Sequence, residues 1–234
     1  MKILTWNCNG AFRTKIDLLK EFTADILVIQ ECENPETSKD NKYKSWATNY
    51  IWTGENKNKG LAIFADNGIK LIKNDWDSNG LKYFISCRVN DNFNLIAVWC
   101  HGDTLDFQYI GQFWKYLQLN KSKFENCIIT GDFNSNSIWD KPRRTWNHSN
   151  VVHELKELEV ESFYHLDRKE EQGQETTPTL YLQRNLNKPY HIDYIFGSDS
   201  FSKRLKCVTV GQAEKWLKIS DHMPVIGELI KSSS

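Results

Sequence analysis

The stretch Ile128-Ile129-Thr130-Gly131-Asp132-Phe133-Asn134 decides how the rest of the sequence is interpreted. Its apolar, β-favouring residues predict a buried strand that ends near a glycine, with a carboxylate and a carboxamide just beyond. Because side chains alternate along an extended chain, Asp132 and Asn134 fall on one face at the strand end. Such a strand end is suited to hold a metal ion or a phosphate. A simple turn is the alternative, since Gly, Asp and Asn are favoured turn residues.

The composition is that of a globular chain with no charge bias. Of its 234 residues, 40% are hydrophobic and 13% are aromatic, which is ample for a packed core. Lys plus Arg and Asp plus Glu number 30 each, so the formal net charge is zero and no global basic field favours nucleic acid. A nucleic-acid substrate is still compatible with this balance, because an enzyme that holds a few phosphates needs only a local basic groove.

The cysteines and the N-terminus indicate a protein of a reducing compartment. The six cysteines are dispersed, without a C-x-x-C pair or zinc-ligand spacing, and most of them lie in apolar runs typical of strands. The N-terminus enters a strand directly and lacks the apolar stretch of a signal peptide, and no window is long enough to span a membrane. We therefore expect a cytoplasmic protein without a membrane segment.

Hydrophobic periodicity predicts a mixed α/β order. Besides the strand at 128–132, strands are expected at 2–7, 26–31, 43–47, 60–65, 69–73, 82–89, 93–100, 179–182, 191–196, 205–210 and 225–230, and helices at 13–24, 105–120 and 151–159. The opening strand, helix and strand are typical of a βαβ unit, and the strands of residues 43–100, joined by short turns, of a β-meander. Neither a repeat nor a long linker divides the chain, so one domain is expected.

Polar residues recur at the ends of these strands. They are Asn7, Glu31, His101, Asp132, Asn134, Asp193 and the pair Asp221-His222. Each alone can be a turn residue or a solvated surface group. Together they offer carboxylates, carboxamides and imidazoles without a thiolate, a donor set that suits Mg²⁺ or Mn²⁺ better than zinc.

The order of these segments resembles the endonuclease/exonuclease/phosphatase superfamily, which includes exonuclease III-type AP endonucleases and deoxyribonuclease I. The matching segments are Leu4-Thr5-Trp6-Asn7-Cys8-Asn9-Gly10, Ile29-Gln30-Glu31, Gly60-Leu61-Ala62-Ile63-Phe64, Thr130-Gly131-Asp132-Phe133-Asn134, His191-Ile192-Asp193-Tyr194-Ile195 and Ser220-Asp221-His222-Met223-Pro224. The resemblance implies a four-layered α/β sandwich, with two mixed β-sheets face to face, helices outside and the site at one end. It covers residues 1–231 as a single domain, followed by a frayed tail at 232–234.

The resemblance also implies a metal site. Glu31 resembles the principal Mg²⁺ ligand of the family, and Asn7 and Asp221 would complete or support the metal shell. A bound metal would lower the pKa of a water molecule and neutralise charge on the phosphate. Mg²⁺ is therefore the expected cofactor, with Mn²⁺ as a substitute.

The catalytic roles carry over residue by residue. Asp132 resembles the group that orients or deprotonates the attacking water, and Asn134 a group that positions the water or the phosphate. Asp193 and His222 resemble an acid–imidazole pair that stabilises the transition state. His101 matches a position that carries His or Tyr in relatives and would contact the phosphate or protonate the leaving oxygen.

Two departures concern the substrate. Where exonuclease III relatives have Thr-Trp, and an Arg just before the Ile-Asp segment, this sequence has Thr179-Leu180-Tyr181 and His191. The pocket for an abasic site is therefore in doubt. The Trp-Cys-Asp-Arg signature of inositol polyphosphate 5-phosphatases is also missing, which argues against that branch.

Substrate contacts are then expected from the loop of residues 135–150. Its Trp139 can stack on a base while Arg143 and Arg144 hold phosphates, a combination typical of sites for single-stranded nucleic acid or a nucleotide. Asn9, in the turn after the first strand, is a further candidate. The alternative is a loop that covers the core, with packed tryptophans and solvated arginines.

These inferences predict a Mg²⁺-dependent phosphodiester hydrolase, a nuclease that cleaves DNA or RNA by attack of a metal-activated water. The expected partner is a nucleic acid or nucleotide substrate, and a monomer is expected. A phosphatase or phosphodiesterase of small nucleotides or lipid headgroups is the alternative within enzymes. A non-catalytic binding module that kept the fold is the alternative outside them.

Overall fold

Strand β8 (Cys127–Asp132) forms the centre of the fold, because every one of its residues is buried. It pairs in parallel with β7 (Phe93–Trp99) and antiparallel with β12 (Asp193–Ser198). Its side chains alternate between two apolar clusters, with Ile128 in one and Ile129 in the other. The strand predicted from the sequence is therefore present and buried on both faces, as its continuous apolar run indicates.

A computed structural model describes residues 1–102 and 107–230 of the chain. Within these residues, two six-stranded mixed sheets are formed, with a two-stranded ribbon beside them. The first sheet has the order β5-β6-β7-β8-β12-β9 and adds β5 (Leu71–Lys73), β6 (Phe84–Val89) and β9 (Val160–Ser162). The second has the order β13-β14-β1-β2-β4-β3, with β13 (Leu205–Val210), β14 (Val225–Leu229), β1 (Lys2–Asn7), β2 (Ile26–Cys32), β4 (Lys59–Ala65) and β3 (Tyr50–Asn56). The ribbon is β10 (Leu180–Tyr181) with β11 (Pro189–Tyr190).

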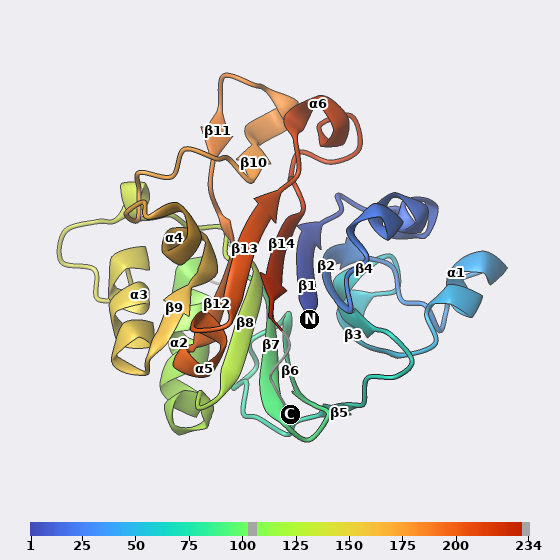
Figure 1. Ribbon diagram of the computed structural model, residues 1–234, viewed down its shortest axis with the longest axis horizontal. Coiled ribbons are helices and arrows are strands. Elements are labelled where there is room, and N and C mark those ends of the chain that lie inside the picture. Colours follow the sequence, from blue (N-terminus) through green and yellow to red (C-terminus); the bar gives the residue numbers. More distant parts are fainter. Residues whose placement is uncertain (103–106, 231–234) are drawn as a thin grey trace.

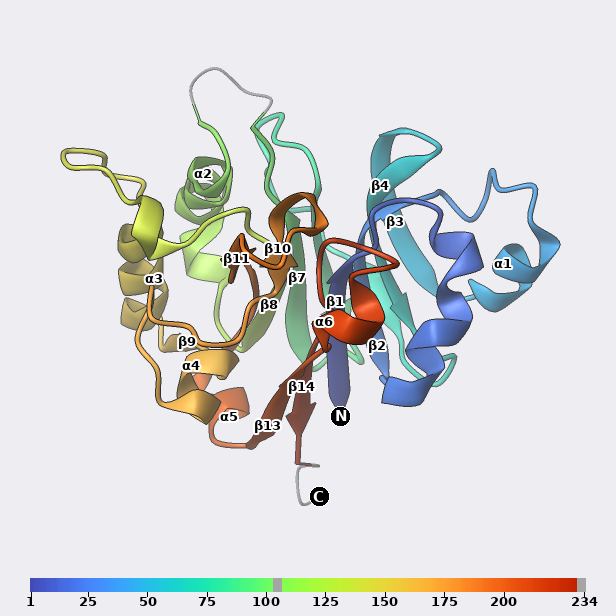
Figure 2. The same cartoon turned by 90° about the horizontal axis from the view of Figure 1, so that it is seen from above.

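Helical segments flank the two sheets (Figures 1 and 2). The α-helices are α1 (Asn41–Trp46), α2 (Ile110–Asn120), α3 (His148–Glu157), α4 (Phe163–Arg168), α5 (Asp199–Ser202) and α6 (Ala213–Trp216). The 3-10 segments are η1 (Phe12–Thr14), η2 (Ile16–Phe22), η3 (Lys121–Lys123), η4 (Ser137–Trp139) and η5 (Leu182–Arg184). In both views α2 and α3 lie outside the first sheet, while α1 and the blue segments η1 and η2 lie outside the second.

Three apolar clusters account for these layers. The inner cluster joins the facing sides of the two sheets through residues such as Ile63 and Ile128. A second cluster packs Phe113 of α2 against the outer face of the first sheet. A third packs Phe12 and Tyr43 against the outer face of the second sheet. The four-layered α/β sandwich expected from the sequence is therefore confirmed.

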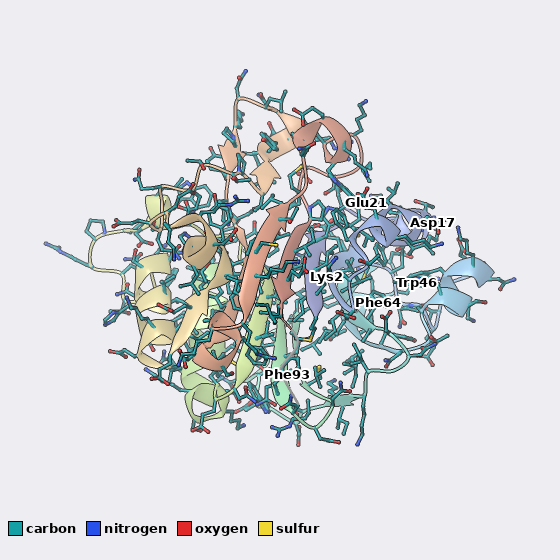
Figure 3. The ribbon with its side chains drawn as sticks, in the orientation of Figure 1. Lys2, Asp17, Glu21, Trp46, Phe64 and Phe93 are labelled. Carbon is teal, nitrogen blue, oxygen red and sulfur yellow. The ribbon has the colours of Figure 1, made fainter. Side chains whose placement is uncertain are left out.

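The expected strand at residues 43–47 is wrong, because this segment is helix α1. The aromatic residues there resemble a strand, but the Asp40 side chain accepts a hydrogen bond from the backbone N–H of Tyr43 and caps a helix. Trp46 of α1 then packs on Phe64 of β4, with ring centroids 4.9 Å apart, and Figure 3 shows the two side chains beside each other. The aromatic pattern therefore reflects packing on a sheet.

Other elements differ in type or length. The helix expected at 13–24 is made of the 3-10 segments η1 and η2, interrupted at Lys15. Strand β3 was not predicted. The helix expected at 105–120 begins at Ile110, and residues 105 and 106 of that prediction lie outside the described residues. The expected frayed tail at 232–234 also lies outside them.

The strand ends that carry polar residues lie at one end of the sandwich. Strands β1, β2 and β8 run toward this end, and β12 starts there, because Asp193 is in register with Asp132. The β10–β11 ribbon and α6 project at the same end, which is uppermost in Figure 1. In the part of the chain that the structure describes, no helix has both the length and the apolar character needed to cross a membrane.

Candidate active site

Asp132 is the centre of the site and is fully buried at the end of β8. One carboxylate oxygen accepts hydrogen bonds from the side-chain amides of Asn7, at 3.0 Å, and Asn134, at 3.1 Å. The other accepts from the backbone N–H of Asn134 at 2.9 Å. Three donors therefore fix the orientation of this carboxylate, as is expected for a group that must direct a reaction.

Asn134 adopts the left-handed conformation, with φ of 46°, which asparagine tolerates better than most residues. Its side-chain amide also donates to the carbonyl of Cys100 at 3.0 Å. The turn that was one interpretation of this segment is thus present, and it serves to direct the amide onto Asp132.

His222 and Asp193 form a buried pair. The ring Nδ1 of His222 lies 3.1 and 3.0 Å from the two carboxylate oxygens of Asp193, and its Nε2 lies 3.9 Å from Asp132. Burial alone would lower the pKa of the imidazole, but the carboxylates of Asp193 and Asp132 outweigh it and raise the pKa to about 10. The ring is therefore an imidazolium at neutral pH and directs its second N–H toward Asp132.

For the Asp132 carboxyl, burial acts on the pKa in the opposite direction to its effect on His222. Burial raises its pKa to about 7, although the charge of His222 and the hydrogen bonds from Asn7 and Asn134 act to lower it. A carboxyl poised near neutral pH can accept a proton during a reaction and lose it afterwards. The geometry thus pairs a proton acceptor with a fixed cation.

Glu31 lies on the next strand at a β-bulge. The register of β2 against β4 shifts between Gln30 and Cys32, and Glu31 has φ of 63°. Its side chain is 18% exposed, and one carboxylate oxygen lies 3.1 Å from the ammonium of Lys59. In the parallel register of β1 and β2, Asn7 pairs with Gln30, so Glu31 is the next residue beyond the partner of Asn7.

Asp221 and Asn9 face each other at the rim. The side-chain amide of Asn9 donates to the Asp221 carboxylate at 3.1 Å. The backbone N–H of Asn9 donates to the side-chain oxygen of Asn7 at 3.1 Å. The candidate metal ligands Asn7 and Asp221 are therefore linked through Asn9, which was predicted as a substrate contact.

His101 lies beside the cluster, immediately after Cys100, whose carbonyl holds Asn134. Its ring stacks on Tyr83 with centroids 4.6 Å apart and meets Trp99 edge-on at 3.9 Å. Its backbone N–H donates to Gln112 at 3.0 Å. The structure thus places His101 near the site and shows an aromatic environment that the sequence did not predict.

A groove of about 520 Å³ opens next to Asn134 and Ser135. Of the three predicted substrate residues in the following loop, Trp139 and Arg144 line this groove, whereas Arg143 is exposed and does not line it. The other residues that line it are Gln108, Tyr109, Ile110, Lys141, Trp146, Leu180, Leu182, Tyr190 and Ile192. The loop therefore forms one wall of a groove that reaches the catalytic cluster.

The two loop residues differ in their freedom. Trp139 is 42% exposed and packs its ring at 5.0 Å from that of Tyr190. Arg144 is held over the Trp146 ring at 4.4 Å and donates to Asn147 at 2.7 Å. Arg144 and Trp146 therefore stabilise the loop by packing on each other, whereas Trp139 stays accessible.

Sequence patterns did not identify Lys59 or Tyr190 as site residues. Lys59 is one lysine in a polar hairpin, and Tyr190 precedes a strand, so neither stands at the end of an apolar run. Their places depend on strand pairing and on the ribbon β10–β11, which are long-range features.

Among the His, Cys, Asp and Glu side chains of the described ranges 1–102 and 107–230, one group of three lies close enough together to hold a metal ion. It consists of Asp132, Asp193 and His222, whose ligand atoms lie within 4.8 Å of one another. In this group Nδ1 of His222 faces both carboxylate oxygens of Asp193, and Nε2 is the ring nitrogen that faces Asp132.

Comparison with known proteins shows the family of the chain and several solved structures with a similar fold. The endonuclease/exonuclease/phosphatase family model matches residues 4–222. A 3′ phosphatase, NExo, from Neisseria, solved with a product DNA hairpin, has a TM-score of 0.71 and 20% identity and covers 99% of this chain and 100% of its own. An AP endonuclease from Archaeoglobus fulgidus has a TM-score of 0.69 and 19% identity, with coverage of 98% and 99%. The APE2 catalytic domain from Xenopus laevis has a TM-score of 0.67 and 15% identity, with coverage of 98% and 91%.

At these identities the solved structures establish the fold, and the family model establishes the family. Among curated proteins, none matches this sequence. The matched range begins in the strand that ends at Asn7 and closes at His222, so it spans the whole cluster of strand-end residues. The chain belongs to the endonuclease/exonuclease/phosphatase family and is a hydrolase of phosphoric ester bonds.

Proposed function

We propose that the chain is a Mg²⁺-dependent nuclease, with Mn²⁺ as a substitute ion, in which Asp132 directs a water molecule at a phosphodiester. The observation that carries the proposal is the contact of Asp132 with Asn7, Asn134 and the Asp193–His222 pair at one end of the sandwich. Phosphoryl transfer needs an oriented nucleophile and fixed positive charge around the phosphate. These groups supply both.

Glu31, with Asn7 and Asp221, is the set that we propose as ligands of a divalent cation. The donors are oxygens, which Mg²⁺ prefers, and the Glu31 carboxylate already attracts a cationic group, the ammonium of Lys59. Bound there, a divalent ion would acidify water and neutralise charge on the phosphate. We assign the Asp132–Asp193–His222 group the catalytic role, because Asp193 holds Nδ1 of His222 and amide donors orient Asp132.

The roles of the chain's own residues follow from their contacts. Asp132, held by three donors, orients water and accepts its proton. His222, held by Asp193, is the cationic group that would stabilise the negative charge that develops on the phosphate oxygens in the transition state. Asn134 offers an amide at the border between the catalytic cluster and the groove. His101, which follows Cys100 beside Asn134, is the further candidate for contact with the phosphate or the leaving oxygen.

The groove supports a nucleic-acid substrate with unstacked bases. Trp139 and Tyr190 contribute aromatic side chains to the groove, and the basic residues Lys141 and Arg144 also line it. Aromatic faces combined with local positive charge are typical of sites for single strands. The Neisseria relative was solved with a DNA hairpin, which is in keeping with this proposal. The buried free thiols further support action in the reducing cytoplasm.

The test is hydrolysis by the purified protein with Mg²⁺, measured separately on single-stranded oligonucleotides, plasmid duplex and phosphomonoesters. We expect cleavage of single strands and a loss of kcat of roughly 10³-fold in Asp132→Asn, since the variant keeps the shape but cannot take a proton. Turnover of phosphomonoesters alone would instead make the protein a phosphatase, and no turnover in any arm would leave a binding module.

Trp139→Ala separates the groove from the catalytic groups in the same assay. We expect KM for single strands to rise about tenfold with kcat nearly unchanged, because a stacking surface is lost and the reacting atoms are not. Ile138→Ala is the matched control, since Ile138 is 55% exposed on the same 3-10 segment and does not line the groove. An equal effect of both substitutions would assign the change to the loop conformation.

A further inference from the structure

Lys59 places a fixed positive charge beside the candidate metal ligand. It begins β4, next to the bulge of β2 that carries Glu31, and its ammonium lies 3.1 Å from the Glu31 carboxylate. The same ammonium lies 5.6 Å from the centre of the Trp99 ring. Trp99 belongs to β7 of the other sheet, so Lys59 contacts residues of both sheets.

The contacts with Glu31 and Trp99 hold the ammonium next to the candidate metal ligand, and the ammonium is still partly accessible to solvent. The Lys59 side chain is 51% exposed, whereas Trp99 is buried and contacts His101 at 3.9 Å. The positive charge therefore lies between the Glu31 carboxylate and the Trp99 ring. A lysine in a plain surface ion pair has no such second contact and has little effect on its surroundings.

A cation at this distance acts on any second cation that Glu31 binds. Two positive charges that share one carboxylate repel each other, and the repulsion is strong where solvent access is limited. This holds whether the ammonium stays on its carboxylate oxygen or moves aside. Charge on a phosphate brought next to the metal reverses the effect, because the ammonium then gains an anion to contact.

We propose that Lys59 couples metal and substrate binding: it weakens the divalent ion at Glu31 in the free enzyme and contacts the substrate phosphate once both are present. The inference rests on the proposed function, since it needs a metal at Glu31 and a phosphodiester substrate. Linkage requires the coupling to be reciprocal, so substrate tightens the metal by the same factor by which the metal tightens substrate.

The experiment measures Mn²⁺ binding by the loss of the free-ion electron paramagnetic resonance signal. It is run with and without a hydrolysis-resistant phosphorothioate oligonucleotide. For Lys59→Met we expect Kd for Mn²⁺ without oligonucleotide to fall about tenfold, and the tightening caused by oligonucleotide to shrink by a similar factor. Lys59→Arg keeps the charge and should behave like the wild type.

Lys57→Met is the matched control, because it removes one positive charge from the same hairpin at an exposed residue outside the Glu31 contact. Thermal unfolding of each variant checks that the hairpin is intact. Equal Mn²⁺ affinity in Lys59→Met and the wild type would overturn the coupling while leaving the metal-dependent function in place. Absence of Mn²⁺ binding to the wild type, or binding unchanged by Glu31→Gln, would overturn the proposed metal site itself.

Discussion

At the scale of single residues, Asp132 and His222 both have raised proton affinities, for different reasons. Burial raises the pKa of Asp132 to about 7, so part of this carboxyl is protonated at neutral pH. The pKa of His222 is raised to about 10 by Asp193 and Asp132, which outweigh its burial. A reaction that needs Asp132 ionised and His222 charged therefore has a window between the two values.

The pH dependence of hydrolysis follows from these two groups. We expect kcat/KM to rise as pH increases through about 7, because Asp132 must lose its proton before it can accept one from water. The rate should fall again near pH 10, where His222 loses its charge. Steady-state rates at fixed, saturating metal from pH 5 to 10.5 measure both limbs.

The control for the alkaline limb is His222→Gln, which should lower the rate and remove the decline near pH 10. Retention of that decline in the variant would assign it to another group. Asp193→Asn should instead shift the decline to lower pH, since the neutral amide no longer favours the charged ring.

The sequence indicated most of the residues that meet at this site, but it did not indicate which side chains contact one another. Asp132 and Asp193 stand at the ends of apolar runs, which is a local signal. The family resemblance then suggested their roles, and the structure brings Asn7, Asp132, Asn134, Asp193 and His222 together. No local pattern indicates that Lys59 faces Glu31 or that Tyr190 faces Trp139, because those contacts depend on pairing between distant segments.

At the scale of elements, β8 can deliver Asp132 only because Gly131 allows a close approach to β7. Gly131 has φ of 151°, and a Cβ atom there would lie 1.8 Å from the backbone oxygen of Val98. Val98 is its direct partner in the parallel register. The glycine before Asp132 is thus required by strand packing, and its presence in the motif has a steric cause.

Gly131→Ala is expected to destabilise the fold by about 3 kcal/mol, because the clash is with backbone that cannot rotate away. Urea unfolding followed by tryptophan fluorescence measures the change. Gly68→Ala is the control, since a Cβ there meets nothing within 4 Å and the midpoint should hardly move. An equal shift in both variants would mean that β7 and β8 separate at little cost.

Element types were predictable where burial is continuous and failed where aromatic residues pack from outside. Strands β1, β2, β7 and β14 match their apolar runs within one or two residues. The segment around Tyr43 has the composition of a strand, yet it forms helix α1. Asp40 caps this helix, and its aromatic rings pack on Phe64. Tertiary contact and one capping side chain outweigh β propensity there.

At the scale of the whole molecule, a buried polar network connects the loop of residues 135–150 to the strand that carries Asp193. The ring nitrogens of His148 lie 3.3 Å from Ser135 and 3.0 Å from Gln172. Asn136, in the same loop, donates to the carbonyl of His191 at 2.9 Å. These contacts connect the segment after Asn134 with residues from three other parts of the chain.

A second part of this network carries a charge. The amide of Asn136 donates to Glu175 at 3.0 Å, and the ring of His165 lies 3.1 Å from the same carboxylate. Burial alone would raise the pKa of Glu175, but the hydrogen bonds from His165 and Asn136 hold it at about 2. The carboxylate therefore stays ionised over the working range and keeps the loop anchored.

The network makes stability depend on pH in a direction that one variant can isolate. Burial lowers the pKa of His148 from 6.5 to about 4. Between pH 6.5 and 4 this histidine is therefore protonated in the unfolded chain and neutral in the folded chain. Stability should fall as pH drops from 6.5 to 4, by about 3 kcal/mol for this group alone. His148→Gln, measured by urea unfolding at several pH values, should show a correspondingly shallower decline than the wild type.

His153→Gln is the control, because His153 lies on the same helix with its side chain 73% exposed and should leave the slope unchanged. Parallel declines in the wild type and His148→Gln would show that the acid sensitivity arises elsewhere in the molecule.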